Sequence, residues 1–211
     1  MKYIEKEIEP EDLKEYKELE GACFRDLPKE VKNNLRESLR REQGGICCYC
    51  ERELKGKTVI EHIKPKDKEY YPELQLEYSN MVLSCDGGES ERKKHDRREN
   101  KNYPLYCDAN KNNKQIYVSP LDDNCEKMFG YGEDGEIYGL SEEANDTINV
   151  LNLSVPFLNH QRKAVIDSIK NTDLTESEWE EELVYYQNRK NDGDFEPFCT
   201  AAIYYIENYV L

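Results

Sequence analysis

The sequence predicts an α+β protein with an N-terminal helix, a small cysteine-rich core, and a mainly α-helical C-terminal region. A β-branched run at 58–60 predicts a strand that ends at His62, and residues 80–84 are predicted to form a buried segment that leads into Cys85. Four further helices are expected at about 141–152, 155–171, 175–190 and 195–209. These features divide the chain into three segments: 1–45, 46–105 and 106–211.

The first segment has the apolar spacing of a helix. Val31, Leu35 and Leu39 recur every four residues, and Pro28 suits an early helical position. Gly44 and Gly45 should stop this helix. In the second segment we expect a tight knuckle at 46–50 and a short helix at about 91–100. The third segment has a weak β pattern around 116–118 and 137–138, and Thr175 with Glu178 predicts a capping box.

Composition excludes several classes of protein. The chain has 211 residues, of which 37% are hydrophobic and 36% charged, and it has no apolar run of about 18 residues that could span a membrane. Its first residues do not form a signal peptide, so we expect a cytoplasmic protein. In that compartment the eight cysteines are not expected to form disulfides. Four scattered cysteines are interpreted as buried core residues: Cys23, Cys107, Cys125 and Cys199.

The net charge of −15 is unevenly distributed. Residues 1–46 carry −2, residues 47–101 carry 0, and residues 102–211 carry −13. Phosphate contacts usually come from Lys and Arg, and in the neutral segment basic residues flank the candidate ligands. We interpret five of them as a nucleic-acid contact: Lys64, Lys66, Arg92, Lys93 and Arg97. The acidic C-terminal segment suggests that a partner supplies part of the nucleic-acid surface.

The cysteine spacing predicts a structural zinc site. Cys47 and Cys50 are separated by two residues, so both thiolates can reach one tetrahedral Zn²⁺. Cys85 is the obvious third ligand. We assign the fourth position to His95, because imidazole is a normal zinc ligand.

A second set of residues predicts phosphodiester hydrolysis. His62 can accept a proton at cellular pH and act as a general base. Glu61 offers the hard oxygen ligands that Mg²⁺ or Mn²⁺ prefers. Asn80 can fix the backbone or the His62 tautomer. Asp96, with Asn100 one helical turn later, can complete the catalytic cation site.

In this order, these residues resemble the HNH (ββα-metal) endonuclease superfamily and, within it, the retron-associated HNH family. That family includes PtuB, the nuclease subunit of Septu anti-phage defence systems. The matching motifs are Leu39-x-x-Glu42-Gln43-Gly44-x-Ile46-Cys47-Cys48-Tyr49-Cys50-Glu51, Ile60-Glu61-His62-Ile63-x-Pro65-Lys66, Tyr78-Ser79-Asn80-Met81-Val82-Leu83-Ser84-Cys85, Gly135-x-Ile137, Thr147-Ile148-x-x-Leu151-Asn152-Leu153 and Leu158-x-x-x-Arg162.

The resemblance implies a zinc-stabilised ββα-metal nuclease core at 46–105, a C-terminal region that docks a partner, and an ATPase partner resembling PtuA in a hetero-oligomer that acts on DNA or other nucleic acid. One departure concerns the end of the motif, where the family reads Cys-His, Cys-Asn or Cys-Asp and this chain has His95-Asp96. We interpret His95 as a zinc ligand and Asp96 as the third HNH letter. The alternative places His95 in the catalytic site and leaves zinc with three cysteines.

Two other functions stay open at the level of sequence. A non-catalytic zinc module that binds nucleic acid or scaffolds a complex needs only the cysteines, and leaves Glu61, His62, Asn80 and Asp96 without a role. A thiol redox protein using Cys47 and Cys50 leaves His62 and Asn80 unexplained. A nuclease accounts for all of them.

Overall fold

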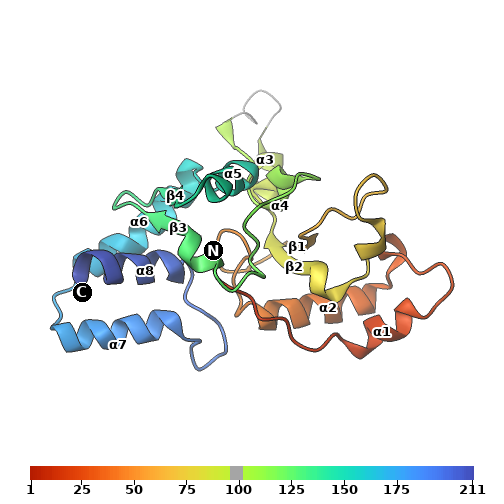
Figure 1. The fold of residues 1–211 in the computed structure, drawn as a ribbon, viewed down its shortest axis with the longest axis horizontal. Helices are drawn as coiled ribbons and strands as arrows, with labels where there is room; N and C mark the ends of the chain where they lie inside the picture. Colours follow the sequence, from red (N-terminus) through yellow and green to blue (C-terminus); the bar gives the residue numbers. More distant parts are fainter. Residues whose placement is uncertain (96–101) are drawn as a thin grey trace.

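The structure, a computed structural model, describes residues 1–95 and 102–211. Within these residues the fold is α+β, as predicted, with eight α-helices and two small antiparallel sheets. Helices α1 and α2 form one end of the molecule, α7 and α8 the other, and the β1–β2 pair lies between them (Figure 1). The helices are α1 (Glu11–Lys17), α2 (Lys29–Glu42), α3 (Glu89–Lys94), α4 (Asp108–Lys111), α5 (Glu142–Leu151), α6 (Pro156–Lys170), α7 (Glu176–Gln187) and α8 (Cys199–Tyr205).

The N-terminal helical segment is two helices rather than one. Leu35 and Leu39 of α2 are fully buried, as their spacing predicted. The helix ends at Glu42, where Gly44 and Gly45 take positive φ angles of 57° and 71°. The Gln43 side chain then accepts from the backbone N–H of Leu83 and donates to its carbonyl oxygen. This pair of bonds explains the Glu42-Gln43-Gly44 motif, because it ties the end of α2 to the neighbouring strand.

The two predicted core segments form one antiparallel pair. Strand β1 (Thr58–His62) pairs with β2 (Met81–Cys85), with His62 opposite Met81 and Thr58 opposite Cys85. All five residues of β2 are buried. Helix α3 begins two residues earlier than the helix predicted at 91–100 and ends at Lys94. The sheet therefore carries Glu61 and His62 at one end and Cys85 at the other.

The second sheet corrects a prediction. Strand β4 (Ile137–Gly139) pairs with β3 (Phe129–Tyr131), and residues 116–118 form no strand. The reason is that the backbone N–H groups of Tyr117 and Val118 both donate to the side-chain oxygen of Thr147 in α5. A side chain thus takes the hydrogen bonds that a neighbouring strand would need.

The four C-terminal helices were predicted to within a few residues. Thr175 and Glu178 make both bonds of the predicted capping box at the start of α7. Helix α8 begins at Cys199 rather than near 195 and continues into a π-helical turn, Ile206–Val210. One cluster of buried apolar side chains runs from Met1 to Ala201, and a smaller one joins α6, α7 and α8. None of the helices in the described part of the chain has the length and apolar character needed to cross a membrane.

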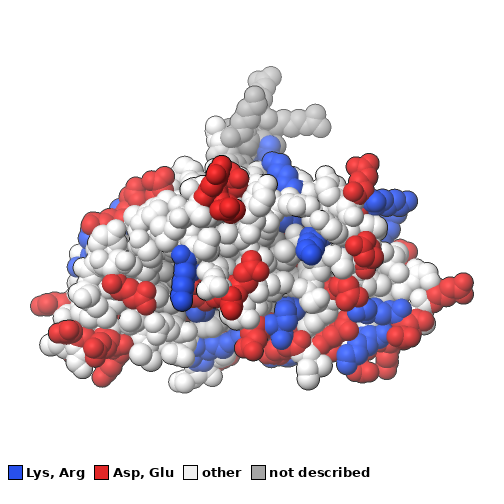
Figure 2. Space-filling model, in the orientation of Figure 1, with Lys and Arg blue, Asp and Glu red and all other residues white. Residues whose placement is uncertain are grey.

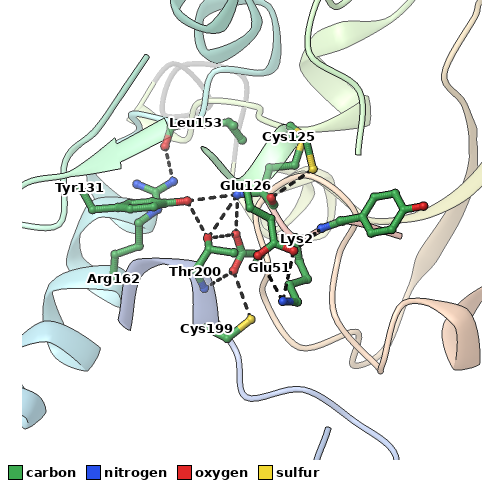
Figure 3. Close-up of polar contacts among 11 residues, drawn as sticks. Lys2, Glu51, Cys125, Glu126, Tyr131, Leu153, Arg162, Cys199 and Thr200 are labelled. Atoms are coloured by element: carbon green, nitrogen blue, oxygen red, sulfur yellow. Dashed lines mark hydrogen bonds and ion pairs between the residues drawn. The ribbon is translucent and has the colours of Figure 1, made fainter. Parts of the chain in front are cut away.

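A buried polar network ties α8 to the knuckle that contains Cys47 and Cys50. Glu51, only 3% exposed, accepts from the backbone N–H and the hydroxyl of Thr200, and the Met1 amino group lies 2.7 Å from its carboxylate. Figure 3 shows Glu51 and Thr200 together with Tyr131, whose hydroxyl lies 2.7 Å from that of Thr200. Since Glu51 directly follows Cys50, α8 and the cysteine-rich core are held together at this point.

Replacing Thr200 with valine should therefore destabilise the whole protein. The change keeps the shape of the side chain but removes one donor from a buried carboxylate, and hydrogen bonds to charged groups contribute about 1.5–3 kcal/mol. We expect a loss of that size in the free energy of unfolding, measured by urea denaturation. The matched control is Thr172→Val, at an exposed threonine after α6, which should change stability by less than about 0.5 kcal/mol. Equal stability of both variants would contradict a structural role for this network.

Candidate active site and metal centre

Four buried cysteines meet at the centre of the fold. Cys47 and Cys50 lie in the knuckle, Cys85 ends β2, and Cys107 directly precedes α4. Their four sulfur atoms all lie within 4.8 Å of one another, with 3.9 Å between Cys47 and Cys107 and 3.8 Å between Cys50 and Cys85. A zinc ion with Zn–S bonds of about 2.3 Å needs tetrahedral edges of about 3.8 Å. The four thiols thus fit a structural Zn²⁺.

The chemistry of the four thiols also fits a cation. None of the eight cysteines, all in the described part of the chain, forms a disulfide. Burial raises the pKa of the Cys50 and Cys107 thiols well above their ordinary value. Thiolates this close and this deeply buried would repel one another unless a metal neutralised them. A cluster of four sulfurs also argues against a redox pair made by Cys47 and Cys50 alone.

The fourth member of this cluster corrects two predictions. We expected His95 to be the fourth ligand and Cys107 to be a core cysteine, but the structure places Cys107 in the cluster and His95 outside it. His95 follows α3, where its ring stacks on Tyr103 at 3.8 Å and its Nε2 lies 3.4 Å from Glu91. His95 is nearer to Cys85 along the chain, whereas Cys107 is the residue whose sulfur lies with the other three.

A glycine turn brings Cys107 back to the cluster. Gly87 has a φ of +58°, and a Cβ at this position would lie 2.2 Å from the carbonyl oxygen of Tyr106. The backbone N–H of Tyr106 donates to the carbonyl oxygen of Gly87, and that of Cys107 donates to Leu151 at the end of α5. These bonds return the chain to the end of β2, so Cys107 lies beside Cys85.

The course of the chain from Gly87 to Cys107 also places α4 against the end of β1. A cleft of about 190 Å³ forms between them. Glu61 and His62 line it from β1, Asp108 lines it from the first position of α4, and Lys66 lines it from the following loop. The strand, the cysteine cluster and α4 therefore position a histidine and two carboxyl groups in one concave site.

His62 is held as a neutral imidazole. Its Nε2 lies 3.0 Å from the carbonyl oxygen of Gln75, which can only accept, so Nε2 carries the proton and Nδ1 is left with its lone pair. Nδ1 lies 3.2 Å from the amino group of Lys66. Burial, followed by the charge of Lys66, lowers the pKa of His62 to about 4. The ring is thus oriented and unprotonated at neutral pH, which a general base requires.

Glu61 and Asp108 form a carboxyl pair. Burial, followed by a hydrogen bond to Glu61 and the charge of Glu61, raises the pKa of Asp108 to about 8. Glu61 also accepts from the Tyr49 hydroxyl at 3.1 Å and lies 2.7 Å from the amino group of Lys111. Lys111 is 1% exposed and donates to the carbonyl oxygen of His62 as well. Two adjacent carboxyl groups that share a proton can instead share a divalent cation.

Asn80 fixes the backbone after β1, one of the two roles expected for it. Its side-chain oxygen accepts from the backbone N–H of Lys64 at 2.8 Å, and its amide donates to the carbonyl oxygens of Lys64 and Leu74. The His62 tautomer, by contrast, is set by Gln75. Asn80 is therefore a positioning residue for the loop that carries Lys64 and Lys66.

Four of the five basic residues that we predicted to contact nucleic acid lie in the described part of the chain. Lys66 lines the cleft, Lys64 lies in the loop held by Asn80, and Lys93 pairs with Glu89 at 3.3 Å. Arg92 lies on α3 and is half-buried. Arg97, and with it the predicted cation ligands Asp96 and Asn100, lie outside the described residues.

Three residues of the site were not predicted from the sequence: Cys107, Asp108 and Lys111. A signal for them was present, because Cys107-Asp108 has the Cys-Asp form that the retron-associated HNH family shows at the end of its motif. The signal was concealed because residues 86–106 separate Cys107 from Cys85 and contain the nearer candidates His95 and Asp96.

Comparisons with known proteins indicate, at a coarse level, a nuclease. No protein-family model matches the chain. The chain resembles the retron-associated HNH endonucleases: it is 28% identical over 175 residues, 76% of its length, to "Retron Vc95 putative HNH endonuclease" of Vibrio cholerae serotype O1 biovar El Tor, covering 80% of that protein.

A second relative comes from a Septu system. The chain is 28% identical over 153 residues, 65% of its length, to "Septu protein PtuA" of Bacillus mycoides (strain KBAB4). The matched part is only 21% of that protein, so about four fifths of PtuA has no counterpart in this alignment.

Proposed function

We propose that this chain is a metal-dependent HNH endonuclease that hydrolyses phosphodiester bonds of nucleic acid, with DNA the expected substrate. The observation that carries the proposal is the cleft that joins His62, Glu61 and Asp108 directly beside the four-cysteine cluster. The strands β1 and β2 followed by α4 would form the ββα-metal core, which extends past the predicted boundary at residue 105. A scaffold needs the cysteines but not an oriented neutral histidine beside two carboxyl groups.

Each residue of the cleft has a role in this proposal. Nδ1 of His62 takes the proton from the attacking water, and Lys66, now 3.2 Å from that nitrogen, moves to the phosphate when substrate enters. Glu61 and Asp108 would hold Mg²⁺ or Mn²⁺, which would stabilise the leaving oxygen. We therefore propose Asp108, rather than Asp96, as the second carboxylate. Lys111 keeps Glu61 in place, and the four cysteines, with zinc bound, would fix α4 against β1.

The direct experiment is cleavage by the purified full chain. Supercoiled plasmid, single-stranded DNA and RNA are incubated with the protein in EDTA, Mg²⁺ or Mn²⁺, and products are resolved on gels. The proposal expects nicking or cutting only with a divalent cation, and zinc in the protein in all three conditions. A protein that contains zinc and binds DNA but never cleaves it, with or without a partner, would favour the non-catalytic module.

We also propose that the chain acts in a defence complex with an ATPase subunit resembling PtuA. The match to a Septu PtuA covers only about a fifth of that protein. This supports the idea, because a domain that is fused to another domain in one system can be a separate subunit of the same complex in another. In Figure 2 the charged side chains over the C-terminal helices are mostly acidic, which would repel a polyanion. The C-terminal region is thus better suited to docking a protein than to binding DNA.

The docking face would be a cluster of tyrosines at the end of α8. Tyr204 contacts the rings of Tyr138 and Tyr209, and Tyr138 and Tyr209 are 37% and 53% exposed. Tyrosine suits interfaces because it buries a large ring and keeps a hydroxyl for hydrogen bonds. Removal of the chain from Thr172 onward would also remove Thr200 and disturb the core, so surface substitution is the cleaner test.

The double variant Tyr138→Ala, Tyr209→Ala should weaken binding to a co-expressed Septu-type ATPase by at least about 30-fold, the effect of losing one interface hot spot. Affinity is measured by titration of the purified subunits. Tyr117→Ala, at a tyrosine that is 63% exposed elsewhere, should bind as the wild type does. Unchanged affinity of the double variant, with normal zinc content, would place the interface on another face.

A further inference from the structure

A second, larger cavity of about 780 Å³ is lined by Ser90 and Glu91 of α3, whose first residue, Glu89, lines the cleft described above. Its wall includes Arg52, Tyr103, Tyr106 and Phe157. The cleft is lined by Glu89 and the cavity by Lys57, and these two side chains form an ion pair of 2.9 Å. The cavity and the cleft are therefore neighbours, separated by this ion pair.

The cavity contains a platform of aromatic rings and a guanidinium group. The rings of Tyr106 and Phe157 are stacked with centroids 6.3 Å apart, and the Arg52 guanidinium lies 4.9 Å from the Phe157 ring. Phe157 is 47% exposed, although it lies at the start of α6 beside buried residues of the core. An aromatic ring left half-exposed in a cavity is available to stack against a flat ligand.

Arg52 has unused hydrogen-bonding capacity. Its guanidinium donates to the Tyr106 hydroxyl, and no carboxylate among residues 1–95 and 102–211 forms an ion pair with it. The acidic groups of the wall are already engaged: Asp86 accepts from the backbone N–H groups of Gly88 and Ser90, and Glu91 pairs with Lys94 at 2.7 Å. The free donors of Arg52 can therefore bind acceptor atoms of a ligand.

We propose that this cavity binds an unpaired nucleobase, stacked on Phe157 and hydrogen-bonded by Arg52. Bases recognised outside a duplex are stacked on aromatic rings and arginine planes in this way. The cavity volume falls in the range of small-ligand sites, about 300–1,000 Å³. The base is carried by a single strand that continues from the cleft, or by a free nucleotide. Binding of a base from a single strand rests on the proposed nuclease function, whereas binding of a free nucleotide does not.

The test uses the fluorescence of 2-aminopurine, which is quenched when the base stacks on an aromatic ring. The full chain is titrated into 2-aminopurine deoxynucleoside monophosphate, into a single-stranded oligodeoxynucleotide with one 2-aminopurine, and into the matching duplex. EDTA is present throughout to prevent cleavage. We expect quenching with the single strand, or with the nucleotide alone if the ligand is a free nucleotide, and none with the duplex.

Phe157→Ala should weaken the quenched complex about 5- to 150-fold, the effect that alanine substitution has on one base–aromatic stack. Phe157→Trp should restore it. Tyr185→Ala, at an aromatic of similar exposure (44%), should leave it unchanged. Zinc content and circular dichroism show that each variant is folded. Absence of quenching with both ligands, or equal quenching by Phe157→Ala, would overturn the proposal.

The result is independent of whether the chain cuts nucleic acid. If cleavage fails but Phe157-dependent quenching is found, the proposed function is wrong and the base site stands. If the chain cleaves duplex DNA at a rate unaffected by Phe157→Ala and no quenching occurs, the nuclease proposal stands and the base site is wrong.

Discussion

Replacing Cys107 with serine is expected to remove zinc from the protein and unfold the core around it. In small zinc domains the bound metal contributes about 10–16 kcal/mol of apparent free energy, as much as the whole stability of a typical domain, about 5–15 kcal/mol. The zinc content, measured by plasma emission spectroscopy, should fall from about one ion per chain to near zero. Far-ultraviolet circular dichroism should show lost structure.

The controls separate the ligand from its neighbours. Cys48→Ala changes a buried cysteine next to Cys47 that lies outside the cluster, and should keep the metal. His95→Ala should also keep the zinc. If His95 were the fourth ligand, as predicted from the sequence, this variant would lose the zinc. If Cys107→Ser is insoluble, Cys107→His tests the same position with a ligand retained. Full zinc in Cys107→Ser together with loss in His95→Ala would reverse our assignment.

The second large effect is expected in catalysis. His62→Ala should reduce cleavage about 10²–10⁴-fold, the usual contribution of a general base. Asp108→Asn should abolish activity at low Mg²⁺, because it removes a carboxylate from the proposed cation site. Burial and the contact with Glu61 raise the pKa of Asp108 to about 8, so its carboxyl is protonated at pH 7 without metal. Asparagine imitates this neutral form, and the variant should fold normally.

Asp96→Asn is the matched control for this experiment. It makes the same chemical change at the residue that the sequence analysis had chosen as the third HNH letter. We expect wild-type cleavage rates in Asp96→Asn, and normal zinc content in all three variants. If Asp96→Asn is inactive and Asp108→Asn cleaves normally, the catalytic cation site includes Asp96 instead. Normal rates in His62→Ala would contradict the role of that residue as the base.

Local sequence was sufficient for the parts of the site that depend on neighbouring residues. The β-branched run before His62 predicted β1, and residues 80–84 were correctly predicted to be buried, although not as the strand β2 that they help to form. The spacing of Cys47 and Cys50 predicted that both thiols belong to one cluster. Capping at Thr175 was predicted for the same reason, since both bonds of the box lie within one helical turn. Each of these features depends on atoms that are close along the chain.

Other features depended on contacts between distant segments. The β pattern at 116–118 forms no strand because Thr147, about 30 residues along the chain, accepts the backbone hydrogen bonds of residues 117 and 118. The burial of Glu51 depends on Thr200, at the opposite end of the sequence. Neither interaction leaves a periodic signal in the sequence.

The fourth cysteine shows this difference most clearly. Local sequence was enough to predict a cysteine cluster and a histidine–carboxylate pair at the end of a strand. The fold brings Cys107 into the cluster and Asp108 into the cleft, which local sequence did not predict. The physical reason is the turn at Gly87, whose positive φ and missing side chain let the backbone at Tyr106 approach it. That approach returns the chain to the end of β2 and places Cys107 closer to the cluster than ligands that are nearer in sequence.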